Sequence, residues 1–456
     1  MRSQFFKLNI LLLIAVTVIT TGFRCTFISP AEKELLEPIA LNWWGVFDDF
    51  DAFSEIINQY KLIHPNITVN YRRLRPEEFA LELLDALAED RGPDIITLQN
   101  TQLGQFQSKL AALPPTTRMA YQVTQKSLGV KQETLVEVRE TPSLTAGQIK
   151  NNFLDVVYDD VIRGNQIYGL PAYVDTLALF YNRDLFNNAG IPLPPTTWTQ
   201  VQDFVSQLTF QDSAGNLIQS GIALGLADNV ERYFDIISLL MMQNGAEMTR
   251  ENRAAFNVVP VGGDSSYNPG PEALRFYADF ADPTKASYTW NESFPSSIDA
   301  FAAGQAAMML GYAYHIPTLE AKRLGKLNYG IAKIPQIEGR PPVNYANYQI
   351  YTVSNKSKYV NEAWDLIQFL TRADQVTKYL NKTGKPTALR ALINEQEAND
   401  VLKPFAQQLL TTKSWYRGSN IDFAEATFGE MITTTAAGEA PQKAASLAAE
   451  KISQAL

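Results

Sequence analysis

Cysteine and histidine are almost missing from this 456-residue sequence, and their scarcity excludes several kinds of chemistry. The one cysteine, Cys25, rules out an internal disulfide framework and any multi-cysteine metal site. The two histidines, His64 and His315, stand far apart in the sequence and outside any metal-ligand motif. We therefore expect no metal site and no cofactor.

An excess of basic residues is lacking too. The chain carries 39 Lys and Arg against 48 Asp and Glu, for a net charge of −9. This balance argues against nucleic acid or anionic lipid as a partner of the folded part. The sequence also contains no Gly-x-Ser-x-Gly elbow and no His-Glu-x-x-His motif. Hydrolases that depend on those motifs are excluded, and we expect no catalytic residues.

What the chain does have is enough apolar material for two folded domains. Its length exceeds the size at which one hydrophobic core usually keeps growing. Apolar residues make up 46% of it and aromatic residues 11%, as in folded globular proteins. No internal repeat and no long Gly/Ser linker divides the sequence, so we expect the two domains to be joined by several short crossings.

The N-terminus has the pattern of an export signal. Arg2 and Lys7 precede an uncharged, mostly apolar run at residues 8–23, which is short for a membrane-spanning helix. The run ends just before Cys25, and residues 1–25 resemble a bacterial lipoprotein signal, in which that cysteine receives the lipid. Arg24 and Gly22 depart from the lipoprotein pattern, so an uncleaved signal anchor stays open beside lipidation of Cys25. Either outcome tethers the chain to a membrane through a polar spacer at residues 26–37.

The first part of the folded chain alternates strands and helices. Short apolar runs at residues 39–46, 67–71 and 95–98 predict strands, and helical spacing predicts helices at 50–60 and 77–89. This order predicts a parallel sheet, and ligands of such sheets bind beyond the carboxyl ends of the strands. Trp43, Trp44, Gln99 and Asn100 are therefore placed near a possible site. Residues 116–152 look like a polar insertion without a strong strand, and a second sheet begins at 177–181.

Seven segments occur in the order typical of one protein family. They are Gly92 to Ile96, Tyr168 to Asn182, Pro195 to Trp198, Ala300 to Met308, Gly330 to Pro335, Ala363 to Leu370 and Gly384 to Thr387. On these segments the chain resembles the extracellular solute-binding proteins of ATP-binding-cassette (ABC) importers, in the sugar-binding branch that includes the maltose-binding protein. Phe301, Met308 and Trp364 fit the motifs as core residues without any reference to the family.

The resemblance implies a two-lobe α/β fold of the periplasmic-binding-protein type II class, with the ligand cleft between the lobes. It implies an N-terminal lobe of residues 38–171 and 346–385 and a C-terminal lobe of residues 176–343 and 390–456. Three hinge crossings are expected at residues 172–175, 344–347 and 386–390. Hinge closure would then enclose the ligand.

A sugar is the ligand that the resemblance favours, and the sequence can supply what a sugar site needs. Flat aromatic rings stack on the C–H faces of a sugar, while carboxylates and amides bind its hydroxyl groups. The candidates for stacking are Trp44, Tyr173, Trp290, Tyr312, Tyr314, Tyr348 and Trp415. The candidates for hydrogen bonding are Asp48, Asn100, Asp175 and Asn344. Asp48 has the alternative role of capping the helix that follows it, and one of Trp43 and Trp44 has the alternative role of a core residue.

Three other functions remain open. A polyamine or another cation could bind in the same fold through Asp48, Asp94 and Asp175. A secreted carbohydrate-active enzyme would need two carboxylates held across a glycosidic bond. A surface sensor would keep the fold without transport. The expected partners are a small solute, the permease subunits of an ABC transporter and the membrane that holds the N-terminal tether. We expect the chain to be a monomer at the outer face of the cytoplasmic membrane.

Overall fold

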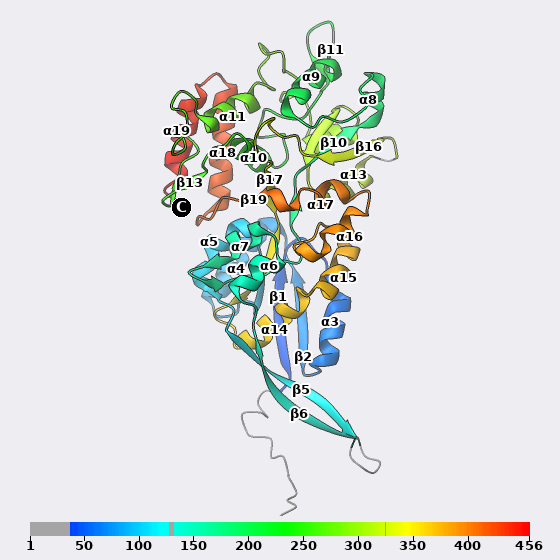
Figure 1. The fold of residues 1–456 in the computed structure, drawn as a ribbon, viewed down its shortest axis with the longest axis vertical. Coiled ribbons are helices and arrows are strands. Elements are labelled where there is room, and N and C mark those ends of the chain that lie inside the picture. The colour runs from blue at the N-terminus through cyan, green and yellow to red at the C-terminus, as the bar shows by residue number, and fades with distance from the viewer. Residues whose placement is uncertain (1–36, 127–131, 324) are drawn as a thin grey trace, which may run out of the picture.

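The computed structural model describes residues 37–126, 132–323 and 325–456, which form a lower and an upper body in Figure 1. Each body has its own hydrophobic core. The core of the first lobe comes from residues 39–174 and 346–393, with Leu409. The core of the second lobe comes from residues 177–343 and 405–452, with Tyr345. Each lobe is therefore assembled from two separated stretches of chain.

The first lobe is built on a five-stranded sheet with the order β2-β1-β3-β18-β4. Strands β1, β2 and β3 are parallel, as the alternating pattern predicts, and β18 runs antiparallel to β3 and β4. The strands are β1 (Ile39–Gly45), β2 (Ile67–Arg73), β3 (Ile95–Gln99), β4 (Leu110–Ala111) and β18 (Gln349–Ser354). The main helices around the sheet are α3 (Asp51–Ile63), α4 (Pro76–Ala88), α14 (Val360–Leu370) and α15 (Ala373–Thr383).

A long hairpin occupies part of the stretch that the sequence pattern assigns to a strandless insertion. Strands β5 (Thr116–Lys126) and β6 (Gln132–Pro142) pair antiparallel and project from the bottom of the first lobe in Figure 1. The prediction of a strandless insertion was wrong, because the polar composition of the stretch concealed the alternation of Met119, Tyr121 and Val123 with mostly polar neighbours. At the root of the hairpin, Thr117, Met119 and Ala120 are buried.

Short elements complete the first lobe. They are η1 (Asn100–Gln102), α5 (Leu103–Phe106), η2 (Gln107–Lys109), α6 (Ala146–Asn152), α7 (Asp155–Val161), β7 (Ile162–Arg163), β8 (Gln166–Ile167), η4 (Arg390–Leu392) and α16 (Ile393–Glu397). Gly104 on α5 makes a close approach to the chain at residues 417–418, since a Cβ there would stand 2.3 Å from the Arg417 carbonyl oxygen. Only glycine permits that contact.

The second lobe contains a three-stranded antiparallel sheet with the order β15-β10-β16. The motif at residues 300–308 forms the end of α12 and the start of β15, with Gly304 at φ +75° in the turn between them. Phe301 and Met308 are fully buried, which confirms them as core residues. The sheet strands are β10 (Ala178–Asn182), β15 (Met308–Gly311) and β16 (Tyr329–Lys333).

Helices cover this sheet and fill the rest of the second lobe. They are α8 (Arg183–Asn188), α9 (Trp198–Leu208), α10 (Tyr233–Gln243), α11 (Pro269–Ala278), α12 (Ser297–Ala302), η3 (Ala313–His315), α13 (Ile316–Lys322), α17 (Lys403–Ala406), η5 (Leu409–Thr411), α18 (Ile421–Ala436) and α19 (Pro441–Ile452). Two small hairpins are formed by β11 (Phe210–Gln211) with β12 (Leu217–Gln219) and by β13 (Thr249–Arg250) with β14 (Arg253–Ala254).

A small sheet with the order β19-β17-β9 lies at the waist between the lobes. Its strands are β9 (Asp175–Thr176), β17 (Asn344–Asn347) and β19 (Thr412–Lys413). Ala346 pairs with Thr176, and Tyr173 bridges to Thr387. Residues of the predicted crossings at 172–175 and 344–347 therefore pair at the waist. Thr387, in the predicted crossing at 386–390, contacts the first of them, and the chain that follows it at 389–393 still packs in the first-lobe core.

Within the described ranges, no helix combines the length and the apolar character needed to cross a membrane. The predicted signal at residues 1–25, with Cys25, and the spacer up to residue 36 lie outside the described residues.

Removing the Trp364 side chain should destabilise the first lobe. The indole is fully buried on α14, and its Nε1 donates to the Ala111 carbonyl oxygen at 3.2 Å. Trp364→Ala should lower the free energy of unfolding by about 3–5 kcal/mol, measured by urea denaturation. Phe210→Ala, at a ring that is 53% exposed, should change it by less than about 0.5 kcal/mol. Equal stability of the two variants would contradict the core position of Trp364.

Asp175 is a buried carboxylate at this waist. Its oxygens accept hydrogen bonds from the backbone N–H groups of Thr176, Ala313 and Tyr314 at 2.8, 3.1 and 3.1 Å. Burial raises the pKa of Asp175 to about 7, although these N–H groups and the positive charge of Lys385 act in the opposite direction. Asp175 thus fastens the start of η3 to β9, and its proton is held more tightly in the folded chain than in the unfolded one.

The stability of the protein should depend on the ionisation of Asp175. Between about pH 4, where an unfolded Asp titrates, and about pH 7, the folded chain keeps a proton that the unfolded chain has lost. Stability from this group is therefore lost as the pH rises through that window, by at most about 4 kcal/mol. Asp175→Asn should become more stable relative to the wild type as the pH rises from 4 to 7. Parallel stability profiles in denaturant titrations would overturn this assignment.

Candidate ligand-binding cleft

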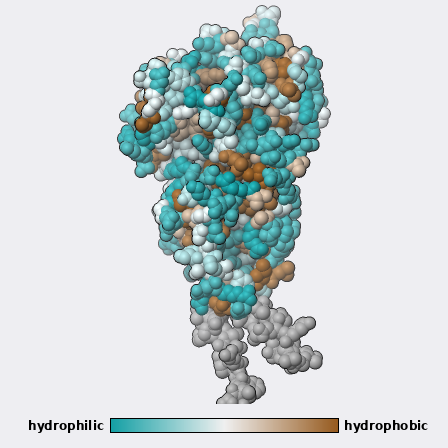
Figure 2. All heavy atoms as spheres, in the orientation of Figure 1, coloured by the Kyte–Doolittle hydropathy of each residue, from teal (hydrophilic) through white to brown (hydrophobic). Residues whose placement is uncertain are grey.

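A cavity of about 960 Å³ lies between the two lobes and is lined by both. The first lobe contributes residues from the loop after β1, from the end of β3 and from the end of α15, and the second lobe contributes residues from η3, α13, α18 and the chain just before α10. Tyr173 and Asn347 line it from the waist. In the view of Figure 2, hydrophobic side chains gather on the surface at the waist, where the lobes meet.

The first-lobe wall is organised by an ion pair between Asp48 and Lys385. The Lys385 ammonium lies 2.6 Å from the Asp48 carboxylate, and both side chains are about nine-tenths buried. The Tyr379 hydroxyl donates to the other oxygen of Asp48 at 2.6 Å. The same ammonium stands 4.1 Å from the centre of the Tyr173 ring. This cluster joins the carboxyl end of β1 to the end of α15 and to the waist.

The second-lobe wall is organised by Arg232. Its guanidinium donates two hydrogen bonds to the buried carboxylate of Asp235, both at 2.9 Å, and a third to Glu425 at 3.3 Å. Burial raises the pKa of Glu425, and the charge of Arg232 acts against this rise. The Tyr312 hydroxyl and the Asn347 amide also donate to Asp235, at 2.7 and 3.1 Å. Asp235 therefore connects the wall to the waist.

Aromatic rings reach the cavity from each lobe. Phe47, after β1, is 59% exposed, and Tyr314, in η3, is 36% exposed. The Tyr314 ring stacks on the fully buried ring of Tyr312, with centroids 5.2 Å apart and an angle of 11° between the planes. His315 lies edge-on to Tyr314 at 4.3 Å. The Tyr314 ring is thus held in place from behind, while part of its surface faces the cavity.

His315 supports this arrangement as a neutral residue. Burial, together with the positive charge of Arg232, lowers the pKa of His315 to about 3. Its Nδ1 accepts a hydrogen bond from the Tyr312 backbone N–H at 3.1 Å, which places the ring proton on Nε2. The ring therefore keeps one tautomer across the physiological pH range.

Carboxylates outnumber cations around the cavity, and half of the lining carboxylates form ion pairs with lining cations. The lining carboxylates are Asp48, Asp49, Asp51, Glu231, Asp422 and Glu425, and the lining cations are Arg232, Lys382 and Lys385. Lys385 pairs with Asp48, Lys382 with Asp51 and Arg232 with Glu425. Amides are present as well, from Gln99, Gln102, Asn347 and Gln349. Because each lining cation is paired with a lining carboxylate, an anionic solute is a poor fit.

Three of the residues that sequence analysis selects for ligand contact line this cavity: Asp48, Tyr173 and Tyr314. Two more lie directly behind it, since Tyr312 supports the Tyr314 ring and Asp175 binds the Tyr314 backbone. The carboxyl-end rule also places Gln99 correctly at the cavity. Asp48 does not cap α3 through its side chain, because its carboxylate binds Lys385 and Tyr379.

The other six candidates are buried elsewhere and do not line the cavity. Trp44 packs in the first-lobe core; Trp290 and Trp415 pack in the second-lobe core, where their indole N–H groups bind Asn229 and Ser238. Asn100 and Tyr348 donate to the carboxylate of Asp160, and Asn344 donates to the Leu177 carbonyl oxygen. Trp43 is likewise buried, with its indole bound to Thr97.

Several lining residues were missed by sequence analysis. Phe47 carried a usable signal, because it follows the carboxyl end of a predicted strand. Asn347 lies inside a predicted hinge crossing. Arg232 and Glu425 carried no local signal, since α18 and the chain before α10 meet only through the tertiary fold of the second lobe.

The described residues contain no group of three or more His, Cys, Asp or Glu arranged to hold a metal ion.

Two known proteins of similar sequence have names that describe sugar binding. The chain is 22% identical over 326 residues to the galactooligosaccharide-binding protein of Bacillus subtilis, a match that covers 71% of this chain and 66% of that protein. It is 22% identical over 300 residues to the multiple sugar-binding protein of Streptococcus mutans, covering 64% of this chain and 69% of that protein. Matches to binding proteins of Brucella cover only 54% of those proteins.

Solved structures show the same fold. The cyclic α-maltosyl-1,6-maltose binding protein of Arthrobacter globiformis superposes with a TM-score of 0.71 at 19% identity, over 91% of this chain and 98% of that one. This likeness confirms the two-lobe, type II fold. The family model for bacterial extracellular solute-binding proteins matches residues 44–377, which is most of the chain. The protein therefore belongs to the bacterial extracellular solute-binding protein family.

Proposed function

We propose that this protein is the solute-capturing component of an ABC importer and that its ligand is a neutral sugar or oligosaccharide. The observation that carries this proposal is a single cavity that receives an aromatic ring from each lobe, Phe47 and Tyr314, beside the amides of Gln99, Asn347 and Gln349. Rings match the C–H faces of a sugar, and amides and carboxylates match its hydroxyl groups. The sugar-binding names of the relatives support the same ligand class.

The junction of the lobes suits a binding cycle of opening and closing. Only short strands, β9, β17 and β19, pair at the waist. A ligand that touches Phe47 and Tyr314 at once favours the state in which these rings are closest. The closed form would dock on the permease subunits and release the sugar chemically unchanged, as expected of a solute-binding protein.

The excess of carboxylates around the cavity supports cationic solutes as a second candidate ligand class. The cations that line the cavity are paired with Asp48, Asp51 and Glu425. Asp49 pairs with Arg73 at 2.7 Å, so Glu231 and Asp422 are the lining carboxylates that remain. A polyamine could use these groups. Any binding screen should therefore contain spermidine beside the sugars.

Removing one ring from the cavity should weaken sugar binding without unfolding the protein. Phe47→Ala and Tyr314→Ala should each raise the dissociation constant about five- to hundredfold, because one stacking ring contributes on the order of 1–3 kcal/mol. A glycan array identifies the sugar, and isothermal titration calorimetry measures its affinity. Mass spectrometry of the recovered sugar should find it intact.

The matched control is Phe210→Ala, because Phe210 is exposed to nearly the same extent as Phe47 but lies on β11, outside the cavity. It should bind like the wild type. Binding of spermidine in place of sugars would move the ligand to the cationic class. Unchanged affinity in both cavity variants would overturn the site.

The membrane tether is a separate proposal and rests on the sequence of residues 1–25. Lipidation of Cys25 places the chain at the outer face of the cytoplasmic membrane. Cys25→Ser should then release the protein from the membrane fraction or leave an unprocessed form, seen by fractionation and intact mass. Two results together would favour the uncleaved anchor. The Cys25→Ser variant would stay in the membrane fraction with residues 1–24 still attached, and the intact mass of the wild type would contain no lipid.

A further inference from the structure

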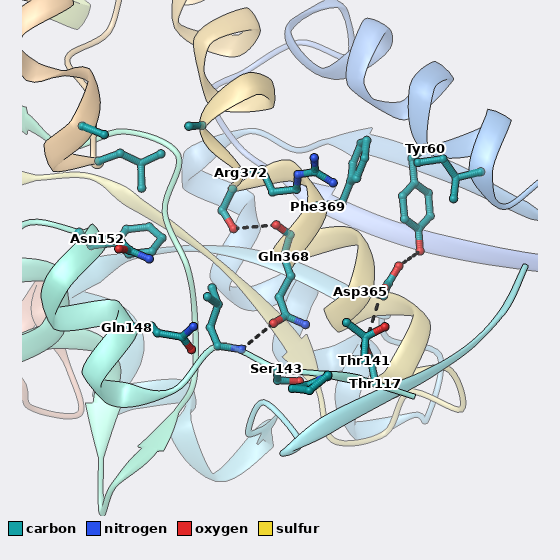
Figure 3. A pocket seen from close by; sticks show the side chains of 18 of the residues that line it. Tyr60, Thr117, Thr141, Ser143, Gln148, Asn152, Asp365, Gln368, Phe369 and Arg372 are labelled. Carbon is teal, nitrogen blue, oxygen red and sulfur yellow. Dashed lines mark hydrogen bonds between the residues drawn. The ribbon is translucent and has the colours of Figure 1, made fainter. Parts of the chain in front are cut away.

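A second cavity, of about 650 Å³, lies in the first lobe at the root of the β5–β6 hairpin. Residues of α3, β5, β6, α6 and α14 surround it, together with the start of α15 and η4. Figure 3 shows side chains from these elements pointing toward one another. None of its lining residues lines the interlobe cleft, so this hairpin-root pocket is a separate site.

One side of the hairpin-root pocket is aromatic. Tyr60 stands 5.4 Å from Phe369 and 4.7 Å from His64, measured between ring centroids, and His64 stands 4.7 Å from Tyr121. Tyr60 and His64 are buried, whereas Phe369 and Tyr121 are partly exposed. The rings thus form a wall against which a flat apolar group can pack.

The floor of the pocket holds polar groups that the protein itself does not use. The Ser143 hydroxyl is buried, with 7% of the residue exposed, and finds no hydrogen-bond partner within the described part of the chain. Gln368 accepts a hydrogen bond from the Leu144 N–H at 2.9 Å through Oε1, so its NH₂ group is the part that remains for a ligand. A buried hydroxyl without a partner is uncommon in folded proteins and marks a place where a bound molecule would supply the acceptor.

The charges around the pocket favour an anion. Arg372 and Arg390 line it against one carboxylate, Asp365, in a protein whose net charge is −9. Asp365 already accepts from Tyr60 and from Thr117, at 2.9 and 3.5 Å. Figure 3 draws the contacts of Asp365 with Tyr60 and Thr117.

Arg372 is the better placed of the two arginines. Arg390 is held by Asp155 at 2.8 Å. The Arg372 side chain is 59% exposed, contacts the similarly exposed Asp374 at 3.3 Å and lies 5.5 Å from the centre of the Phe369 ring, so its charge stands beside the aromatic wall. Exposed ion pairs of this kind contribute little, so Arg372 can turn to a stronger partner. Arg372 is also the N-cap residue of α15, where the helix dipole adds positive potential.

We propose that the hairpin-root pocket binds a small aromatic carboxylate. The ring packs against Phe369 and Tyr121, the carboxylate faces Arg372 and the α15 N-terminus, and the Ser143 hydroxyl donates to an acceptor of the ligand. The proposal is independent of the sugar site, because the two cavities share no residue.

The probes are 4-hydroxybenzoate and 4-hydroxyphenylacetate, whose ring hydroxyl offers Ser143 an acceptor apart from the carboxylate, each with its neutral amide as a matched control, added to the full chain purified in detergent. Saturation-transfer NMR and thermal shift should detect saturable binding of the acids and weaker binding of the amides. Arg372→Gln should weaken acid binding about five- to tenfold, the effect of one partly exposed charge-assisted contact. Ser143→Ala should weaken it too, without lowering the melting temperature, because the hydroxyl has no partner to lose.

The matched control is Arg91→Gln, since Arg91 is 61% exposed and pairs with Glu89, also two residues away, but lies outside the pocket. It should bind the acids like the wild type. Acids that bind no better than their amides, acid affinity unchanged in both pocket variants, or displacement of the acids by a sugar that occupies the cleft would each overturn the proposal.

Discussion

The side-chain amide of Asn347 is the point through which the two lobes are held in register. Its oxygen accepts a hydrogen bond of 2.7 Å from Gln99, at the end of β3, and its NH₂ donates to Asp235 on α10. Asp235 is almost fully buried and carries the Arg232 guanidinium and the Tyr312 hydroxyl. A shift of β17 would therefore disturb the central sheet of one lobe and the cavity wall of the other together.

A second buried carboxylate, Asp160, makes a comparable junction. It accepts from Asn100 and Tyr348 in the first lobe and from Ser414 and Arg417 in the chain that follows β19. A buried carboxylate is tolerated only when hydrogen bonds replace its lost hydration. Asp160 has donors from both sides of the waist, and Asp235 has donors from the second lobe and from the waist strand β17. Separating the lobes fully would therefore leave the buried charge of Asp160 short of partners.

The parts of the fold that could be predicted are those with a strong local pattern. The parallel order of β1, β2 and β3 follows from apolar runs alternating with helical spacing, and the burial of Phe301 and Trp364 follows from their place in such patterns. The hairpin β5–β6 was missed because the short alternation of Met119, Tyr121 and Val123 stands in a mostly polar stretch.

The site was harder to predict than the fold, for a physical reason. An aromatic residue near a strand end can lie in a core as well as in a cleft. Trp290 and Trp415 lie in the core, where their indole N–H groups have buried hydrogen-bond partners. Tyr314 was distinguishable only through its loop position after β15. Arg232 and Glu425 meet across 193 positions of sequence, which no local pattern encodes.

The division of each lobe between two stretches of chain has a consequence for the order of folding. One of the two neighbours of β3 in the central sheet is β18, whose register joins Gln99 to Gln349, residues that are far apart in the sequence. Contacts of such high sequence separation form slowly, because a long loop must close before they add stability. The second lobe likewise needs α18 and α19, at the very end of the chain, to cover α10 and α11. During synthesis from the N-terminus, the first-lobe core cannot close before residues 346–393 have emerged, and the second-lobe core cannot close before residues 405–452 have emerged. Each lobe therefore waits for a distant stretch of chain, and the first lobe can close before the second.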